Sequence, residues 1–293
     1  MTHPHNQLGL ALGVAGVVLF AGTLPATRFT VATIDPLFLT VARAAIAGIA
    51  GLIALTLLRR PLPPRPLWHE IFLGGSCTVV GFPMLTALAM VSVPAAHGGV
   101  VLGIVPLATA GAAALVAHER PSGGFWIASL VGAAIVIIFV LSRPQARTFA
   151  IGDLFLFGTV LAGAFGYALS GRVSMTMPGW EVVSWQVVGF LPFSLVAAFL
   201  LRPHDFSVIP VKAWLGLAYV GLVSQFFAFF VFNAAMAMTG VARIGQLMLL
   251  QPFVIVALAA LIDGEPIEVA TLAYAAAVVA TVLAGQRMPV RRR

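Results

Sequence analysis

The most constraining feature of this sequence is a stretch that occurs twice. The segment VPAAHGGVVLGIVPLATAGAAALVAHE, from Val93 to Glu119, matches GVARIGQLMLLQPFVIVALAALIDGE, which ends at Glu265. The same interval of 146 positions separates Pro106 from Pro252 and Glu119 from Glu265. Each copy contains an apolar run of roughly 23 residues, which as a helix covers about 35 Å and can cross a bilayer. The repeat therefore predicts a membrane protein built from two related halves.

The composition agrees with a membrane protein and excludes a soluble one. Hydrophobic residues make up 61% and charged residues only 9% of the 293 positions, whereas soluble domains carry about 25% charged residues. The net charge of +7 does not predict nucleic-acid binding, because the basic residues are scattered between apolar runs and cluster only at the terminal Arg291-Arg292-Arg293. We expect the partners to be the lipid bilayer and a small-molecule substrate, with no nucleic acid, and the chain to act as a monomer.

Ten apolar runs predict an all-α integral membrane protein with ten transmembrane helices. The expected spans are 8–29, 36–58, 69–90, 94–117, 124–142, 153–174, 180–201, 213–237, 241–262 and 268–286. Residues 8–142 and 153–286 each hold five spans. Because five is odd, two copies of such a unit lie in the membrane with opposite orientations, which is the inverted-repeat plan of many secondary transporters.

The basic residues predict the orientation of the chain. With ten spans, both termini lie on the same side of the membrane. The connections on that side carry ten Arg or Lys residues and those on the other side carry five. Positive charge is enriched on the cytoplasmic side of membrane proteins, so we expect both termini in the cytoplasm. No cleavage site follows the first apolar run, so we expect that run to be retained rather than removed as a signal peptide.

Several motifs stand at fixed places in the two halves. Arg43 lies early in the second span, in TVARAAIAG, and TALAMVSVPAAHGG precedes a fourth span that closes in HERP. NAAMAMTGVARIG and LLQPFVIVALAALIDGEP are their counterparts, and thirteen positions separate the proline of each copy from its glutamate. With these features the chain resembles the drug/metabolite transporter superfamily, specifically proteins with two EamA-type repeats, and within it bacterial amino-acid exporters. The resemblance implies a multi-pass protein of the bacterial inner membrane. The sequence departs from the pattern of this family at Trp185, which occupies the position where the second half would repeat Arg43.

Polar and aromatic side chains inside apolar spans are the candidate substrate contacts, because burying them in a membrane is costly. The candidates are Arg43, His97, Tyr167, Trp185, Gln186, Gln225, Asn233 and Gln246. Each amide is as readily explained by a hydrogen bond between helices as by a ligand contact. Arg43 could brace a helix end or meet a substrate carboxylate, and His97 could simply be solvated at a helix start. Together these residues would line a nearly uncharged cavity that suits a zwitterion.

Prolines within the spans are the candidate hinges, because each removes a backbone hydrogen bond and kinks its helix. They are Pro25, Pro83, Pro106 and Pro252. Membrane helices tolerate proline generally, so a purely structural role stays open. The recurrence of Pro106 and Pro252 at the repeat interval favours pivots in the fourth and ninth spans.

The function predicted from these features is export of amino acids of broad range, including aromatic ones, or of related small metabolites, by alternating access through a central cavity between the repeats. The alternative is export of aromatic drugs or other amphipathic compounds, favoured by the phenylalanine-rich eighth span. A membrane enzyme is disfavoured, because no H-E-x-x-H or G-x-S-x-G motif occurs. We expect no cofactor and no metal. The carboxylates all fall at span ends or in connections, which favours a carrier that is not coupled to protons.

Overall fold

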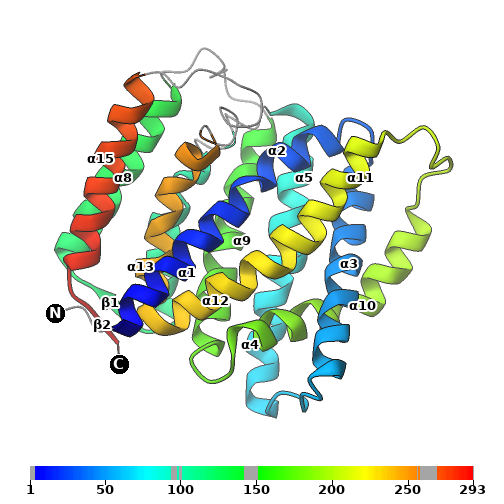
Figure 1. Ribbon diagram of the computed structural model, residues 1–293, viewed down its shortest axis with the longest axis horizontal. Coiled ribbons are helices and arrows are strands. Elements are labelled where there is room, and N and C mark those ends of the chain that lie inside the picture. Colours follow the sequence, from blue (N-terminus) through cyan, green and yellow to red (C-terminus); the bar gives the residue numbers. More distant parts are fainter. Residues whose placement is uncertain are drawn as a thin grey trace.

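The computed structural model describes residues 4–93, 98, 101–141, 151–255, 257 and 269–292. Figure 1 shows a bundle of helices packed side by side, with one two-stranded ribbon at the end where both termini lie. Among the described residues, seven helical segments are long and apolar enough to cross a membrane, and three shorter apolar helices accompany them. These segments occupy the places of the ten predicted spans, so the predicted fold class is confirmed.

The helices of the two halves follow one another in corresponding order. The first half contains α1 (Pro4–Ala21), α2 (Thr23–Thr30), α3 (Pro36–Leu57), η1 (Arg65–Leu67), α4 (Trp68–Gly75), η2 (Ser76–Gly81), α5 (Phe82–Ser92), α7 (Val105–Val116) and α8 (Gly123–Leu141). The second half contains α9 (Ile151–Val173), α10 (Gly179–Leu200), α11 (Val211–Ala218), η3 (Tyr219–Phe227), α12 (Ala228–Thr239), α13 (Val241–Gln246), η4 (Leu247–Leu250) and α15 (Val269–Arg287). In Figure 1, α3 begins at the end of the bundle where α10 finishes, as inverted halves require.

The ends of α3 illustrate how the sequence bounds a span. The Asp35 side chain accepts hydrogen bonds from the backbone N–H groups of Leu37 and Phe38, at 2.8 and 3.0 Å. An aspartate at the N-cap followed by proline at the first helical position is a strong start signal. After the last turn, Arg59 takes a left-handed backbone conformation with φ 49°, and the proline-rich connection to η1 follows.

The contacts between the halves pair elements that are related by the internal repeat. α3 packs along α10, whereas α1 packs along α12 and α5 along α9. The repeat makes the last two pairs equivalent, because α9 is the counterpart of α1 and α12 that of α5. Glycines permit the close approach of α3 and α10: a Cβ built at Gly51 would lie 3.2 Å from the Ser184 carbonyl oxygen, and one at Gly48 would lie 3.1 Å from the Val187 carbonyl oxygen. Small residues favour close packing of helices in a membrane, where the hydrophobic effect does not drive helices together.

Two wide, π-helical segments occur at matching places in the halves. η2 lies in the third span and η3 in the eighth, and the 146-residue interval carries η2 onto 222–227, inside η3. The Gln225 side-chain amide of η3 donates to the Thr78 carbonyl oxygen of η2 at 3.1 Å. The halves are therefore joined by a hydrogen bond at their two irregular segments, a helix type that is frequent at functional sites.

The four candidate hinge prolines each follow a break in regular α-helix. Such breaks are the turn at Gly22 before Pro25, η2 before Pro83, the turn at 103–104 before Pro106, and η4 before Pro252. Pro83 and Pro106 lie in the first turns of α5 and α7. The helix runs without a break from η2 into α5, since the Phe82 N–H donates to the Cys77 carbonyl oxygen, so Pro83 still removes a backbone donor from that span.

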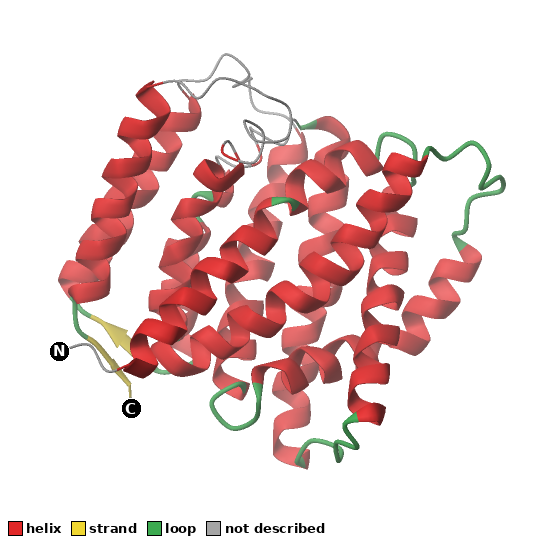
Figure 2. Ribbon diagram, viewed as in Figure 1, coloured by secondary structure: helices red, strands yellow, loops and turns green. Residues whose placement is uncertain are grey.

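The ribbon was not anticipated from the sequence. β1 (Glu119–Pro121) pairs antiparallel with β2 (Val290–Arg292), so that Arg120 lies opposite Arg291. Figure 2 shows these strands in yellow beside the chain ends. Hydropathy identifies apolar spans but gives no signal for two short polar segments that pair only because the fold brings them together.

Candidate substrate site

A buried arginine lies at the contact between α3 and η3. Arg43 is only 2% exposed. Its Nη2 donates a long hydrogen bond of 3.4 Å to the Ser224 hydroxyl, and its Nε has no hydrogen-bond partner within the described ranges. A guanidinium offers five donors, and an incompletely paired buried charge is costly. This position therefore favours an anionic group that is supplied from outside the protein.

Small polar groups from both halves gather around Ser224, the hydrogen-bond partner of this guanidinium. The Thr23 hydroxyl of α2 and the Ser224 hydroxyl of η3 lie 2.8 Å apart. The neighbouring Gln225 is 1% exposed, and while its amide nitrogen reaches η2, its Oε1 has no hydrogen-bond partner in the part of the chain that is described. Thr23, Arg43, Ser224 and Gln225 form what we call the polar cluster.

An aromatic wall adjoins the polar cluster. Its members are Phe20 of α1, Tyr167 of α9, and Phe229 and Phe232 of α12. The Phe20 ring centroid lies 5.0 Å from that of Phe229 and 6.2 Å from that of Tyr167. Tyr167 is 5% exposed and lines one cavity together with Thr23, which connects the wall to the cluster. The rings offer apolar edges and faces of the kind that accept side chains or cations.

Two small cavities lie between the halves beside this wall. One of about 20 Å³ is lined by Phe20, Thr23, Leu24, Phe82, Leu102, Val105, Tyr167, Met248 and Gln251. The second, of about 10 Å³, shares Leu24, Leu102, Met248 and Gln251 with it. A single water needs roughly 10–15 Å³, so the larger cavity can hold a water but not an amino acid. The pathway between the described residues is therefore contracted in this conformation.

The structure separates the eight sequence candidates into groups. Arg43, Tyr167 and Gln225 belong to the polar cluster and aromatic wall. Asn233, fully buried, donates to the Gly179 carbonyl oxygen at 3.3 Å, which joins α12 to the start of α10. Gln246 donates to the Ser129 hydroxyl at 3.4 Å, which joins α13 to α8. His97 lies outside the described residues.

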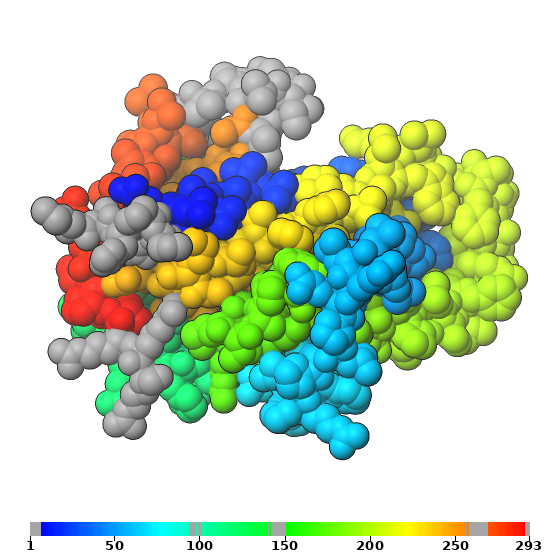
Figure 3. All heavy atoms as spheres, turned by 60° about the horizontal axis from the view of Figure 1, so that its bottom comes forward, coloured from blue at the N-terminus to red at the C-terminus, as the bar shows by residue number. Residues whose placement is uncertain are grey.

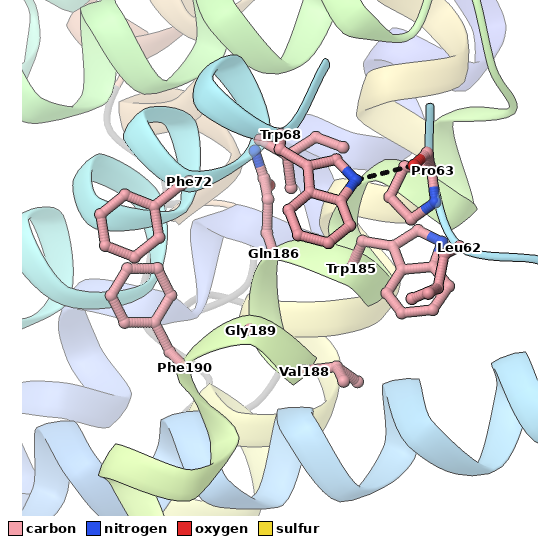
Figure 4. Close-up of a pocket in the computed structure, with 10 residues that line it drawn as sticks. Leu62, Pro63, Trp68, Phe72, Trp185, Gln186, Val188, Gly189 and Phe190 are labelled. Carbon is pink, nitrogen blue, oxygen red and sulfur yellow. Dashed lines mark hydrogen bonds between the residues drawn. The ribbon is translucent and has the colours of Figure 1, made fainter. Parts of the chain in front are cut away.

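The remaining two candidates, Trp185 and Gln186, line a different cavity. It has a volume of about 240 Å³ and lies between α4 and α10 (Figure 4), and no residue of the polar cluster lines it. Residues that the candidate set omitted join the central site instead: Thr23, Ser224 and Gln251. Threonine and serine are common in membrane helices, so the first two gave no sequence signal. Gln251 precedes the repeated Pro252 and donates to the Phe20 carbonyl oxygen at 3.1 Å.

Buried carboxylates in the described part of the chain lie near helix ends. Glu181 is in the first turn of α10 and pairs with Arg60 at 3.2 Å, and Asp153 is in the first turn of α9. Glu119 lies in β1 and caps the start of α13 through its two oxygens. Within the described residues, no group of three or more His, Cys, Asp or Glu side chains could hold a metal ion. Among the described residues, the central site thus presents one cation, hydroxyls, amides and aromatic rings.

Comparison with known proteins gives consistent matches along the chain. The model of the EamA-like transporter family matches residues 7–141 and 150–284. The chain is 39% identical over 275 residues to an uncharacterized transporter, YdeK, of Bacillus subtilis strain 168, covering 94% of this chain and 96% of the relative. It is 27% identical over 290 residues to a probable terminal-alkyne amino-acid exporter of Streptantibioticus cattleyicolor, covering 96% and 94%.

A solved crystal structure has the same fold. It superposes with a TM-score of 0.75 at 21% sequence identity, covering 96% of this chain and 98% of the solved one. At this identity the similarity concerns the arrangement of helices alone.

Proposed function

We propose that this chain, which belongs to the EamA-like transporter family, exports amino acids of broad range, or closely related small metabolites, across the bacterial inner membrane. Transport would proceed by alternating access, with the substrate held between the two inverted halves. The observation that carries the proposal is the buried, incompletely paired guanidinium of Arg43 beside the Thr23 and Ser224 hydroxyls.

Each part of an amino acid has a matching surface in this site. A carboxylate is a strong partner for guanidinium and hydroxyl donors. The unpaired Oε1 of Gln225 can accept from an ammonium group. The aromatic wall offers contact to an aliphatic or aromatic side chain without imposing one shape. This division supports a carrier that recognises the backbone of its substrate and tolerates varied side chains.

The contracted cavities require a larger opening during the cycle. A volume of about 20 Å³ does not hold an amino acid, so the halves must separate on one side before the substrate enters. The interrupted helices next to Pro25, Pro83, Pro106 and Pro252 are suited to such motion, because fewer regular helical bonds must break at these points. We therefore keep these prolines as proposed hinges.

The relative named as a probable terminal-alkyne amino-acid exporter supports this substrate class. At 27% identity it does not determine which amino acids this chain would carry. The competing substrate class, aromatic drugs and amphipathic compounds, is favoured by the aromatic wall. Arg43 separates the two classes, because a cationic drug would be repelled by a buried guanidinium whereas a carboxylate would be attracted.

The experiment is counterflow uptake into proteoliposomes that contain the purified chain. A panel of labelled amino acids is compared with an aromatic cationic drug. We expect saturable uptake of several amino acids, and we expect Arg43→Gln to raise their KM by roughly 30-fold or more, because losing one partner of a buried charge pair costs about 2 kcal/mol or more. Arg43→Lys should restore part of this loss, since it returns the charge without the planar fork.

The control is Arg202→Gln, which removes an exposed guanidinium that donates to the Phe199 carbonyl oxygen at the end of α10. It should leave KM unchanged. Uptake of the drug alone, or amino-acid uptake with the same KM in Arg43→Gln, would refute the proposal. A pH gradient imposed in the same vesicles tests the expected lack of proton coupling: accumulation of substrate against its own gradient would contradict it.

A further inference from the structure

A close contact between α7 and α13 lies between the central cavities and the end of the molecule where the termini lie. A Cβ added at Gly245 of α13 would lie 2.7 Å from the Thr109 methyl carbon of α7, so only glycine allows the two helices to come this close. The cavity of about 20 Å³ is lined by Val105, at the start of α7, and by Met248, just after α13. The contact of α7 with α13 therefore separates this cavity from that end.

A buried carboxylate holds α7 and α13 together beyond this contact. Glu119 follows α7 in the chain and is 1% exposed. Its two oxygens accept from the Val241 and Ala242 N–H groups, which open α13, each at 2.9 Å. The ribbon supports this position, because β1, which contains Glu119, pairs with β2, and the Ser122 N–H donates to the Pro289 carbonyl oxygen at 3.0 Å. The start of the second half's α13 is thus bound to the end of the first half's α7.

Arg172, in the last turn of α9, completes this closure. Its Nη1 donates to the Val116 carbonyl oxygen at the end of α7 at 2.9 Å, and its Nη2 lies 3.3 Å from the Glu70 carboxylate of α4. The last carbonyls of a helix have no partner in that helix, and a cation there interacts favourably with the helix dipole. A Cβ added at Gly171 would lie 2.5 Å from a Val241 methyl carbon, so the end of α9 also packs directly on α13.

The two ends of the molecule differ in their charged contacts between the halves. Two ion pairs join described residues of opposite halves, that of Arg172 and that of Arg60 with Glu181, and both lie at the end where the termini lie. Arg202 is the counterpart of Arg60 at an interval of 142 and lies at the opposite end, where it donates to the Phe199 carbonyl oxygen of its own helix. Figure 3 turns the end with the termini toward the viewer, and there the end of α9, in green, lies between α12, in yellow, and α4, in cyan.

We propose that Glu119 and Arg172 form a gate that closes the pathway at the end where the termini lie, and that both must release their partners for substrate to pass there. We call these two residues and their partners the terminal gate. The inference rests on the alternating-access part of the proposed function and is independent of the substrate class. Opening exchanges hydrogen bonds within the protein for hydrogen bonds to water, so the gate biases the equilibrium toward the closed state without preventing opening.

The position of the gate agrees with the proposed hinges. α7 and α13 are the parts of the fourth and ninth spans that lie between the repeated prolines, Pro106 and Pro252, and the end with the termini. Regular α-helix is interrupted beside both prolines. Movement of α7 and α13 about these breaks separates them at the gate and leaves the opposite parts of the two spans in place.

The test measures how often α7 and α13 separate in the full chain. The reporter is Thr109→Cys in a Cys77→Ala background. Thr109 is fully buried at the contact, and its hydroxyl has no hydrogen-bond partner in the described part of the chain, so the replacement removes no bond. A membrane-impermeant methanethiosulfonate is added to membrane vesicles from the side on which the termini lie, without substrate. The reagent reaches this cysteine when the gate is open, so the labelling rate follows the open population.

We expect slow labelling in the parent and faster labelling when the gate is weakened. Glu119→Gln should raise the rate about tenfold and Arg172→Gln about fivefold, because each loses charge-assisted hydrogen bonds of the closed state. Arg172→Lys should have an intermediate rate, since it keeps the charge without the planar fork. Arg65→Gln is the control, because it removes an exposed arginine at the same end that is not part of the gate, and it should leave the rate unchanged.

A second reporter distinguishes opening of the gate from general loosening of the bundle. Ser194→Cys lies in α10, where Ser194 is 1% exposed, and its labelling should stay slow in every variant. Unchanged labelling of Thr109→Cys in either Glu119→Gln or Arg172→Gln would overturn the proposal, and so would an equal acceleration at Ser194→Cys.

Failure of the gate and failure of the proposed substrate class give different results. If the reporter responds as expected but amino acids are not exchanged in proteoliposomes, the gate stands and the substrate class is wrong. If amino acids are exchanged but the reporter does not respond, the substrate class stands and the gate is wrong.

Discussion

Glu119 links the two halves through a single side chain. It is 1% exposed, and its two carboxylate oxygens accept from the backbone N–H groups of Val241 and Ala242, each at 2.9 Å. These N–H groups open α13 and have no partner within that helix. A carboxylate at a helix start also interacts favourably with the helix dipole. The sequence placed Glu119 at the end of one repeat, and the structure adds that it caps a helix of the other.

We expect Glu119→Ala to lower the free energy of unfolding by about 2–3 kcal/mol, because two buried N–H groups lose a charged acceptor. Glu119→Gln, which keeps one oxygen, should have a smaller effect. Thermal unfolding in detergent, followed by loss of the monodisperse fraction, measures both. Glu70→Ala is the control: its partly exposed pair with Arg172, at 3.3 Å, is worth about 0–1 kcal/mol. Equal losses in the two alanine variants would contradict the capping role.

Polar residues within apolar runs were the predicted site residues, but the pattern did not predict which residues each of them would contact. Arg43, Tyr167 and Gln225 meet near the contact between the halves, whereas Asn233 and Gln246, chosen on the same grounds, join pairs of helices elsewhere. The difference lies in which neighbouring helix each side chain faces. Helical periodicity gives the angle between two side chains on one helix, and it contains no information about the partner helix.

At the scale of helices, the irregular segments recur with the repeat. η2 and η3 lie at equivalent places, and both interrupt spans that hydropathy represents as continuous. Sequence reasoning located the prolines beside such breaks because proline has a fixed backbone angle and no N–H. No sequence pattern predicted the π-helical segments η2 and η3 themselves. They lie where side chains and carbonyl groups of the two halves meet, as in the hydrogen bond from Gln225 to Thr78.

If the prolines after these breaks are hinges, Pro106→Ala and Pro252→Ala should each slow substrate exchange. Alanine allows regular helix to extend through the break, which stiffens the span. We expect about a tenfold loss of rate, equivalent to ~1.4 kcal/mol on the barrier, with normal membrane insertion. Initial rates of counterflow in proteoliposomes, normalised to inserted protein, give the measurement.

Pro192→Ala is the matched control for this experiment. Pro192 lies inside α10 and has regular helix on both sides. Its replacement should affect the rate less than either repeat proline does. Unchanged exchange in both Pro106→Ala and Pro252→Ala would refute the hinge role.

For the whole molecule, the inverted arrangement determines which surfaces meet. α3 and α10 occupy equivalent places in the two halves and pack along each other, while α5 packs against α3 and its counterpart α12 against α10. The aromatic wall and the polar cluster take residues from both halves for this reason. The ribbon of β1 and β2 joins the connection between α7 and α8 to the segment after α15 and lies beside α13.

The proposed orientation can be tested by labelling single cysteines in a Cys77→Ala background. Arg65 is exposed in the connection at the end where the termini lie, and Val208 is 72% exposed in the connection between α10 and α11 at the opposite end. We expect a membrane-impermeant maleimide to label Val208→Cys in intact cells and Arg65→Cys only after permeabilisation. The reverse pattern would place the termini outside the cytoplasm.

The number of spans, their boundaries and the duplication are properties that the sequence alone determines, because apolar length, helix-end signals and internal repeats are recorded along the chain. The odd number of spans in each half then dictates their inversion. Only the tertiary structure decides that Thr23, Ser224 and Gln251 join the central site, that Trp185 and Gln186 line a separate cavity, and that two polar segments form a ribbon. These outcomes depend on the rotation of each helix about its axis relative to its neighbours. Wide turns and glycine contacts change that rotation, which is determined by packing between residues far apart in the chain.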